Sequence, residues 1–179
     1  MGGGVAMKYQ DCAEALQADD WADGGAVRLA DANINPATGL ATDYLNHFNE
    51  AIMLLEMLSS CPDCRDDFLG WRPMSYREHF EASRFKGRAL AIAAYDAADP
   101  SLRGCLDTLA GTMTAVLEAT RAAMSSDIPP RSAVALAERA AALLRPLAAR
   151  AGAVINGEDS AGLPAAPQAV VDGLMKNSA

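Results

Sequence analysis

The chain has 179 residues and a formal net charge of -8, and about a fifth of its residues are alanine. This length is typical of one domain that buries a core of its own, so neither disulfides nor a metal is needed for folding. The acidic balance opposes binding to nucleic acid or to an anionic membrane, because both need a net basic face on the protein.

The sequence predicts a cytoplasmic protein. Its N-terminus, MGGGVAMKYQ, lacks the basic flank and apolar core of a secretory signal, and no later stretch reaches roughly 18 uncharged apolar residues. The four cysteines, Cys12, Cys61, Cys64 and Cys105, are too few for the disulfide framework of a small secreted protein. We therefore expect reduced thiols.

The composition predicts an all-α fold. Alanine is abundant, aromatic residues make up 6% of the chain, and β-branched residues do not gather into alternating runs. We expect an antiparallel bundle of four main helices, with a short N-terminal helix, in a single domain of residues 1–157. Residues 158–179 should form a flexible, linker-like tail whose last apolar turns dock as a short helix.

The first helix is expected at residues 9–21, and the glycines at positions 24 and 25 should break it. Residues 31–39 predict an irregular loop with an Asx turn, because Asn, Pro and Gly supply turn geometry. A longer helix should follow at residues 42–60. Its apolar residues cover most of the cylinder, so it is either the central helix of the domain or covered on one face by a second copy.

Two later helix starts carry explicit signals. Ser75 and Glu78 form a capping box at the start of a helix predicted over residues 75–98. Asp99 as N-cap and Pro100 at the first helical position then begin the next helix, which carries a clear apolar stripe. Two capped starts predict two separate helices.

The last long helix is predicted over residues 131–155. Pro146 should kink this helix, and Asn156-Gly157 should end it. Because the connections between residues 75 and 155 are short, neighbouring helices should run antiparallel.

One group of candidate site residues lies near the start of the helix predicted at residues 42–60. Asp43, His47 and Glu50 are spaced so that they share one helix face. The ordinary interpretation is a half-buried histidine whose ring nitrogens are satisfied by the two flanking carboxylates. The functional interpretation is a small-ligand or acid-base pocket with His47 and Glu50 as its polar end and with Tyr44 and Phe48 as its walls.

A second group comprises Cys61, Cys64 and His79. Roughly 21 Å of helix separates His47 from Cys61, so the two groups cannot share a metal ion. An antiparallel return of the next helix should bring His79 close to both cysteines, which makes a zinc or thiol-redox site an alternative. Since a closed zinc site needs four ligands and this corner offers three, we expect no metal and no cofactor.

Two stretches of the sequence, DYLNHFNEAIMLLEML and GWRPMSYREHFEASRF, carry a family resemblance. They resemble a group of uncharacterised small helical proteins of alphaproteobacteria, over about residues 40–125. The resemblance implies a bacterial, cytoplasmic setting, and it transfers no activity and no site residue.

The sequence favours a non-enzymatic protein that acts by protein–protein association, in a regulatory or scaffold role. It has no nucleophile elbow, phosphate-binding loop or dinucleotide fingerprint, and its polar side chains do not converge. A homodimer through the helix at residues 42–60, or through the one that begins at Asp99, is the expected form. The alternatives are the small-ligand or acid-base pocket at His47 and Glu50, and the zinc or thiol site at Cys61, Cys64 and His79.

Overall fold

The computed structural model describes residues 24–158 and 167–176, and every regular element in these residues is an α-helix. In chain order the helices are α2 (Gly24–Asp31), α3 (Tyr44–Met57), α4 (Cys64–Gly70), α5 (Tyr76–Ala82), α6 (Arg88–Ala97), α7 (Pro100–Met124), α8 (Pro130–Ile155) and α9 (Pro167–Lys176). The predicted all-α class is thereby confirmed. The helix predicted at residues 9–21 lies outside the described residues.

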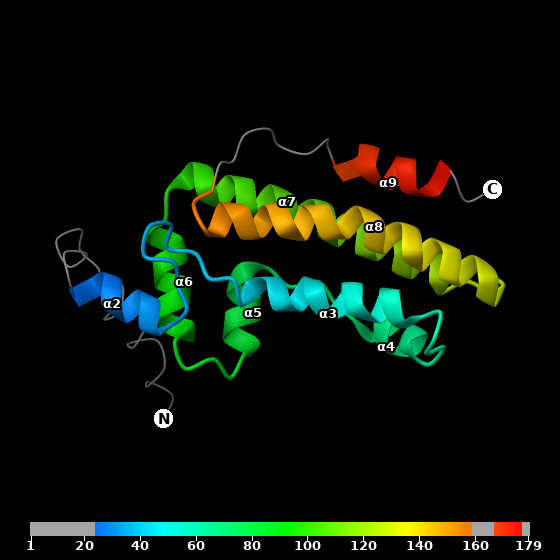
Figure 1. Cartoon of the computed structure of the whole chain (residues 1–179), viewed down its shortest axis with the longest axis horizontal. Coiled ribbons are helices and arrows are strands. Elements are labelled where there is room, and N and C mark those ends of the chain that lie inside the picture. Colours follow the sequence, from blue (N-terminus) through cyan, green and yellow to red (C-terminus); the bar gives the residue numbers. More distant parts are fainter. Residues whose placement is uncertain (1–23, 159–166, 177–179) are drawn as a thin grey trace, which may run out of the picture.

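The long helices α7 and α8 form an antiparallel hairpin, and α3 packs along α8 (Figure 1). Helix α7 begins where predicted, because the Asp99 carboxylate accepts hydrogen bonds from the backbone N–H groups of Ser101 and Leu102. Helix α8 ends at Ile155 with Asn156 as its C-cap, and Gly157 follows with a φ of +74°. Helix α9 lies against α7, where Leu174 is buried.

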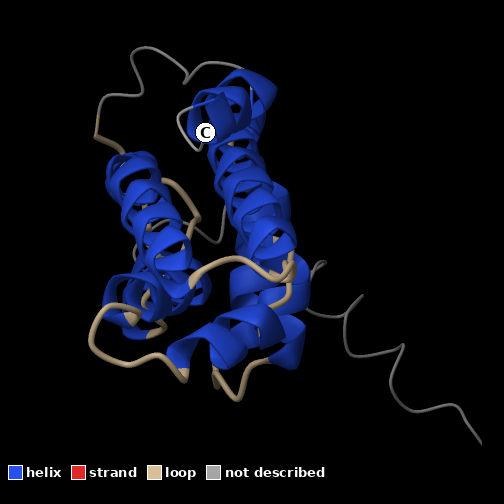
Figure 2. Cartoon of the chain, turned by 90° about the vertical axis from the view of Figure 1, so that its right-hand side faces the viewer, coloured by secondary structure: helices blue, strands red, loops and turns tan. Residues whose placement is uncertain are grey.

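The single helix predicted over residues 75–98 is instead two helices, α5 and α6, joined by a loop at residues 83–87. The Ser83 side chain donates to the carbonyl of Phe80 and accepts from the N–H of Phe85, so it replaces helical hydrogen bonds with local ones. The ring of Phe85 then packs on that of Phe80, with 5.7 Å between centroids. Figure 2 shows the short helices linked by loops beside the long pair.

Helix α3 is shorter than predicted, and its own neighbours cover most of its apolar surface. One face, which includes Phe48 and Ile52, is fully buried against the rest of the bundle. The opposite stripe is polar apart from Met53 and Met57, whose side chains are 48% and 42% exposed. The bundle therefore buries most of α3 without a second copy.

The loop at residues 32–43 fixes the start of α3. The predicted Asx turn is present, since the N–H of Ala37 donates to Asn35 Oδ1 at 2.8 Å. Thr38 Oγ1 donates to the carbonyl of Ile155 at 2.6 Å, which ties the loop to the end of α8. The N–H of Ala41 donates to the hydroxyl of Tyr76 at 3.0 Å, which ties it to α5.

Within the described ranges, no helix has both the length and the apolar character that crossing a bilayer requires.

Replacing Gly39 by Ala is expected to lower the free energy of unfolding by about 2 kcal/mol. Gly39 has a φ of +71°, and a Cβ at this position would lie 2.9 Å from the carbonyl oxygen of Ala94. Gly104 is the matched control, because it lies within α7 and a Cβ there meets nothing within 4 Å. Gly104→Ala should raise stability by about 1 kcal/mol. Urea denaturation measures the free energy of unfolding of both variants. Equal effects of the two substitutions would contradict the claim that the loop requires glycine at position 39.

Candidate functional site

The extended segment at residues 71–75, between α4 and α5, covers the first two turns of α3. It is held at both ends by hydrogen bonds from other elements. Trp71 Nε1 donates to the carbonyl of His47 at 3.1 Å, and the Tyr44 hydroxyl donates to the carbonyl of Met74, also at 3.1 Å. From α7, Arg121 donates to the carbonyl of Trp71 at 2.7 Å. These bonds place the indole of Trp71 over α3.

His47 lies beneath this segment and is 6% exposed. Its imidazole stacks on the indole of Trp71, with 4.7 Å between ring centroids and 23° between planes. Its Nε2 atom is buried and has no hydrogen-bond partner. A buried polar atom without a partner costs about 1–3 kcal/mol, so an orphaned ring nitrogen in a native core indicates a place where a ligand or water bonds.

The imidazole of His47 is neutral at physiological pH. Burial and, to a smaller extent, the neighbouring His79 lower its pKa from 6.5 to about 4, against a hydrogen bond to the backbone of Arg72 that favours the charged form. Because that bond favours the charged form, the ring is its donor; because Nε2 has no partner, the donor is Nδ1. Nε2 therefore carries a lone pair and acts as a hydrogen-bond acceptor.

His79 lies beside His47, with 6.1 Å between ring centroids, and beside Tyr44, with 5.8 Å. Burial lowers the pKa of His79, while the charge of Asp43 and a hydrogen bond to its backbone raise it. Asp43 therefore interacts with His79 and favours the protonated form of that ring. The predicted pairing of Asp43 with His47 is not found. The two imidazoles come from α3 and α5 and form one cluster.

A cleft of about 450 Å³ opens beside His47. Its walls come from α3, α4 and the segment at residues 71–75; the lining residues are His47, Glu50, Leu54, Asp67, Gly70, Trp71, Arg72 and Met74. The guanidinium of Arg72 donates to the carbonyls of Leu69 and Trp71, so it is already engaged. Glu50 and Asp67 are exposed and leave two carboxylates at the mouth of the cleft.

The cleft contains part of the predicted site and adds residues that the sequence pattern did not indicate. His47 and Glu50 both line it, as proposed from their spacing. The predicted walls do not: Phe48 is fully buried in the core, and Tyr44 lines a different cleft. Trp71 and Asp67 take their place. The only sequence signal for Trp71 is its position two residues before Pro73, where a helix is expected to end.

The larger cleft that includes Tyr44 has a volume of about 690 Å³ and lies between the start of α5 and α7. Its tyrosine hydroxyls are all bonded within the chain: Tyr44 to Met74, Tyr76 to Ala41, and Tyr95 to both carboxylate oxygens of Asp107. Unlike the cleft at His47, it presents no orphaned ring nitrogen.

The turn between α3 and α4 carries Cys61 and Cys64. The predicted approach of His79 to these cysteines is wrong, because α4 fills the space where the next helix was expected and α5 packs on the first turns of α3 instead. Across residues 24–158 and 167–176, no group of three His, Cys, Asp or Glu side chains is arranged to hold a metal ion.

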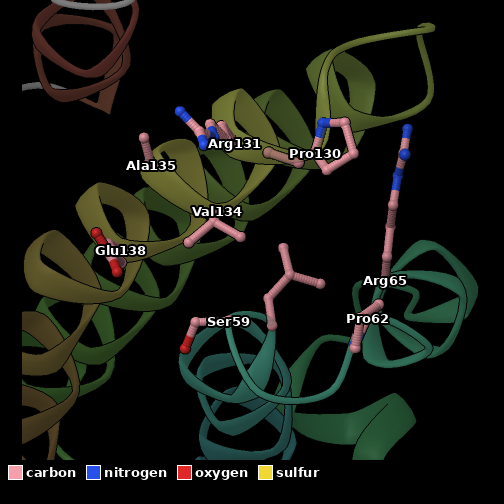
Figure 3. A pocket seen from close by; sticks show the side chains of 10 residues that line it. Ser59, Pro62, Arg65, Pro130, Arg131, Val134, Ala135 and Glu138 are labelled. Atoms are coloured by element: carbon pink, nitrogen blue, oxygen red, sulfur yellow. The ribbon is translucent and has the colours of Figure 1, made fainter.

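An apolar groove of about 530 Å³ lies next to this cysteine turn (Figure 3). Pro62 and Arg65 form one wall, and Pro130 and Val134 of α8 form the other. Arg65 donates to the carbonyls of Met124 and Ser126, which holds the turn against the end of α7.

Comparison with family models, curated proteins and solved structures finds no match to this chain. The resemblance of residues 40–125 to small alphaproteobacterial helical proteins therefore stays a prediction.

Acid should destabilise the protein through His47. In the folded state its pKa is about 4 and in the unfolded chain about 6.5, so between these values the unfolded chain binds more protons. The free energy of unfolding should therefore fall as the pH drops from about 6.5 to 4, by up to about 3 kcal/mol from this residue. Urea denaturation at a series of pH values measures it.

The matched variant for this measurement is His47→Gln, whose amide does not titrate in this range. Its stability should fall less steeply with acid than that of the wild type, and the difference between the two curves isolates His47. Parallel curves would show that His47 does not titrate with a lowered pKa.

Proposed function

We propose that the chain is a non-enzymatic binding protein whose site is the cleft at His47, and that its ligand is a small amine or related nitrogenous cation. The observation that carries the proposal is the orphaned Nε2 of His47, a buried acceptor on a residue that lines the cleft. The ligand's N–H group is proposed as the partner of this atom. The cleft's volume of about 450 Å³ lies within the usual range of small-molecule sites, roughly 300–1,000 Å³.

The charges around the cleft favour a cation over an anion. Glu50 and Asp67 bring two negative charges to the cleft against the one positive charge of Arg72, whose Nη1 donates to backbone carbonyls. The indole of Trp71 adds an aromatic surface that attracts cations. One lone pair, two carboxylates and an aromatic ring together match a protonated amine that carries a small apolar body.

Binding rather than catalysis is the function that these groups support. An imidazole with a pKa of about 4 is a weak base, and it lies below the range in which general bases are most effective near neutral pH. Across the described residues lining the cleft there is no serine, threonine or cysteine to act as a nucleophile. His47 therefore acts as a fixed hydrogen-bond acceptor.

Benzylamine is a suitable probe, with benzyl alcohol as its uncharged counterpart of similar shape. Benzylamine should bind and shift the amide resonances of Trp71 and Glu50, whereas benzyl alcohol should bind at least about tenfold more weakly, a difference of 1.4 kcal/mol. Nuclear magnetic resonance titration of the wild type measures both. Equal affinities for benzylamine and benzyl alcohol would contradict the assignment of an amine ligand. Resonance shifts confined to residues away from Trp71 and Glu50 would contradict the location of the site.

Asp67→Asn and Asp66→Asn form a matched pair for the same titration. Both substitutions remove one negative charge from an exposed position of α4, but only Asp67 lines the cleft. Asp67→Asn should weaken benzylamine binding by about tenfold, while Asp66→Asn should leave it within about twofold. Equal losses would show that net charge alone attracts the probe.

We also propose a weak homodimer through α3, the second candidate function. Met53 and Met57 are one helical turn apart and are two of the three exposed large apolar side chains in the described residues. Two methionines bury much less area than a stable interface of roughly 1,200 Å² or more, so the association should depend on concentration. A regulatory or scaffold role would follow from such a dimer.

Substituting Met53 and Met57 together by Gln should shift the chain toward monomer. The third exposed apolar residue, Val27, lies on α2 and is the control: Val27→Gln should leave association unchanged. Analytical ultracentrifugation over a range of protein concentrations measures the mass. A wild type that stays monomeric throughout, near 18.7 kDa, would contradict the dimer.

A further inference from the structure

We propose that Cys61 and Cys64 form a thiol–disulfide exchange site, in which Cys61 attacks a disulfide and Cys64 releases the product. This site is separate from the cleft at His47 and does not depend on it. The proposal stands on the geometry of the turn between α3 and α4, on the unequal exposure of the two thiols and on the contact between them.

The backbone of the turn brings the two cysteines within reach of one another. The N–H of Cys64 donates to the carbonyl of Cys61 at 3.1 Å, and the N–H of Arg65 donates to the carbonyl of Pro62, also at 3.1 Å. A hydrogen bond between residues three apart closes a turn in which the end Cα atoms lie within roughly 7 Å, which is compatible with a disulfide. The two thiols lie close enough that Cys61 affects the pKa of Cys64.

The two thiols differ in the way that the two steps of exchange require. Cys61 is partly exposed, whereas Cys64 is 5% exposed at the start of α4. The hydrogen bond with Cys61 and burial raise the pKa of Cys64 to about 11, so Cys64 keeps its proton. Cys61 is therefore the attacking group, and Cys64 acts after Cys61 has formed a bond.

A groove lies beside the turn, and Cys61 itself is partly exposed. Pro62, which separates the two cysteines, lines the groove together with Leu58 and Ser59 from the end of α3 (Figure 3). A molecule that carries a disulfide can therefore come alongside the turn. Arg65, which lines the same groove, ties the turn to the carbonyls of Met124, the last residue of α7, and of Ser126.

The exchange balances without any further reagent. The thiolate of Cys61 attacks one sulfur of a disulfide, the S–S bond breaks, and one thiolate leaves and takes a proton from water. Cys64 then attacks the Cys61 sulfur and expels the second thiolate, and the proton of Cys64 passes through water to that leaving thiolate. Two electrons pass from the cysteine pair to the disulfide, giving a Cys61–Cys64 disulfide and two free thiols.

Oxidised glutathione tests the assignment on the full-length, fully reduced protein. The wild type should release two glutathione thiols per chain at this turn, with any reaction of Cys12 and Cys105 counted separately, and gain a disulfide between Cys61 and Cys64, located by peptide mapping. Cys64→Ser should stop after one thiol, with glutathione retained on Cys61. Cys61→Ser should react at least about tenfold more slowly at this turn, because the remaining thiol is buried.

Cys105 supplies the internal control, because it is also partly exposed but lies alone on α7. Cys105→Ser should give the wild-type disulfide. Cys64→Ala accompanies Cys64→Ser, so that an effect of the buried hydroxyl on folding is separated from loss of the thiol. Glutathione retained on Cys61 of the wild type, equal rates in the two single variants, or no reaction at the turn would each overturn the proposal.

Discussion

The packing of the first two turns of α3 against residues 71–80 is the constraint on which the site depends. This contact holds two imidazoles and an indole in one buried cluster, and its polar atoms are bonded across elements: Trp71 to His47, Tyr44 to Met74, and Ala41 to Tyr76. These bonds join α3 and the loop before it to the segment after α4 and to α5, and that segment supplies Trp71, Arg72 and Met74 to the cleft. Helix α7 supports this contact, because Arg121 donates a hydrogen bond to the carbonyl of Trp71 in the segment at residues 71–75.

Burial gives the cluster its chemistry. The pKa of His47 and that of His79 are both lowered, so the two rings lie side by side without charge repulsion at neutral pH. A charged pair at this separation in a poorly hydrated site would be strongly unfavourable. The ring's bond to the backbone of Arg72 and the unpartnered Nε2 make Nε2 the acceptor of the neutral ring. The preference for a ligand with an N–H group follows from this one tautomer.

Local signals predicted the helix ends that are set locally. The capping box of Ser75 and Glu78, the Asp99 cap and the glycine after Asn156 all lie where the sequence indicated, because each acts through hydrogen bonds or backbone angles within a few residues. Helix α4 and the break at residues 83–87 were missed. They depend on the burial of Phe68 and on the contact between Phe80 and Phe85, and helical periodicity does not report such contacts.

The candidate site was predicted in part for the same reason. His47 and Glu50 share a helix face by spacing alone, so their common cleft was foreseeable. The approach of His79 to His47 was not, because it depends on α4 turning the chain back toward the start of α3. Asp67 and Trp71 reach the cleft through the same turn, and no pattern in the sequence marks either residue as a partner of His47.

The most direct test of this account is the protonation state of His47 in the folded protein. Two-dimensional ¹H–¹⁵N spectra of the imidazole nitrogens, recorded over a range of pH, report the tautomer and the pKa together. The account predicts a neutral ring with its proton on Nδ1 and a pKa of about 4, and a change in the Nε2 resonance when benzylamine is added. A ring that is charged near pH 6, or one that carries its proton on Nε2, would contradict it.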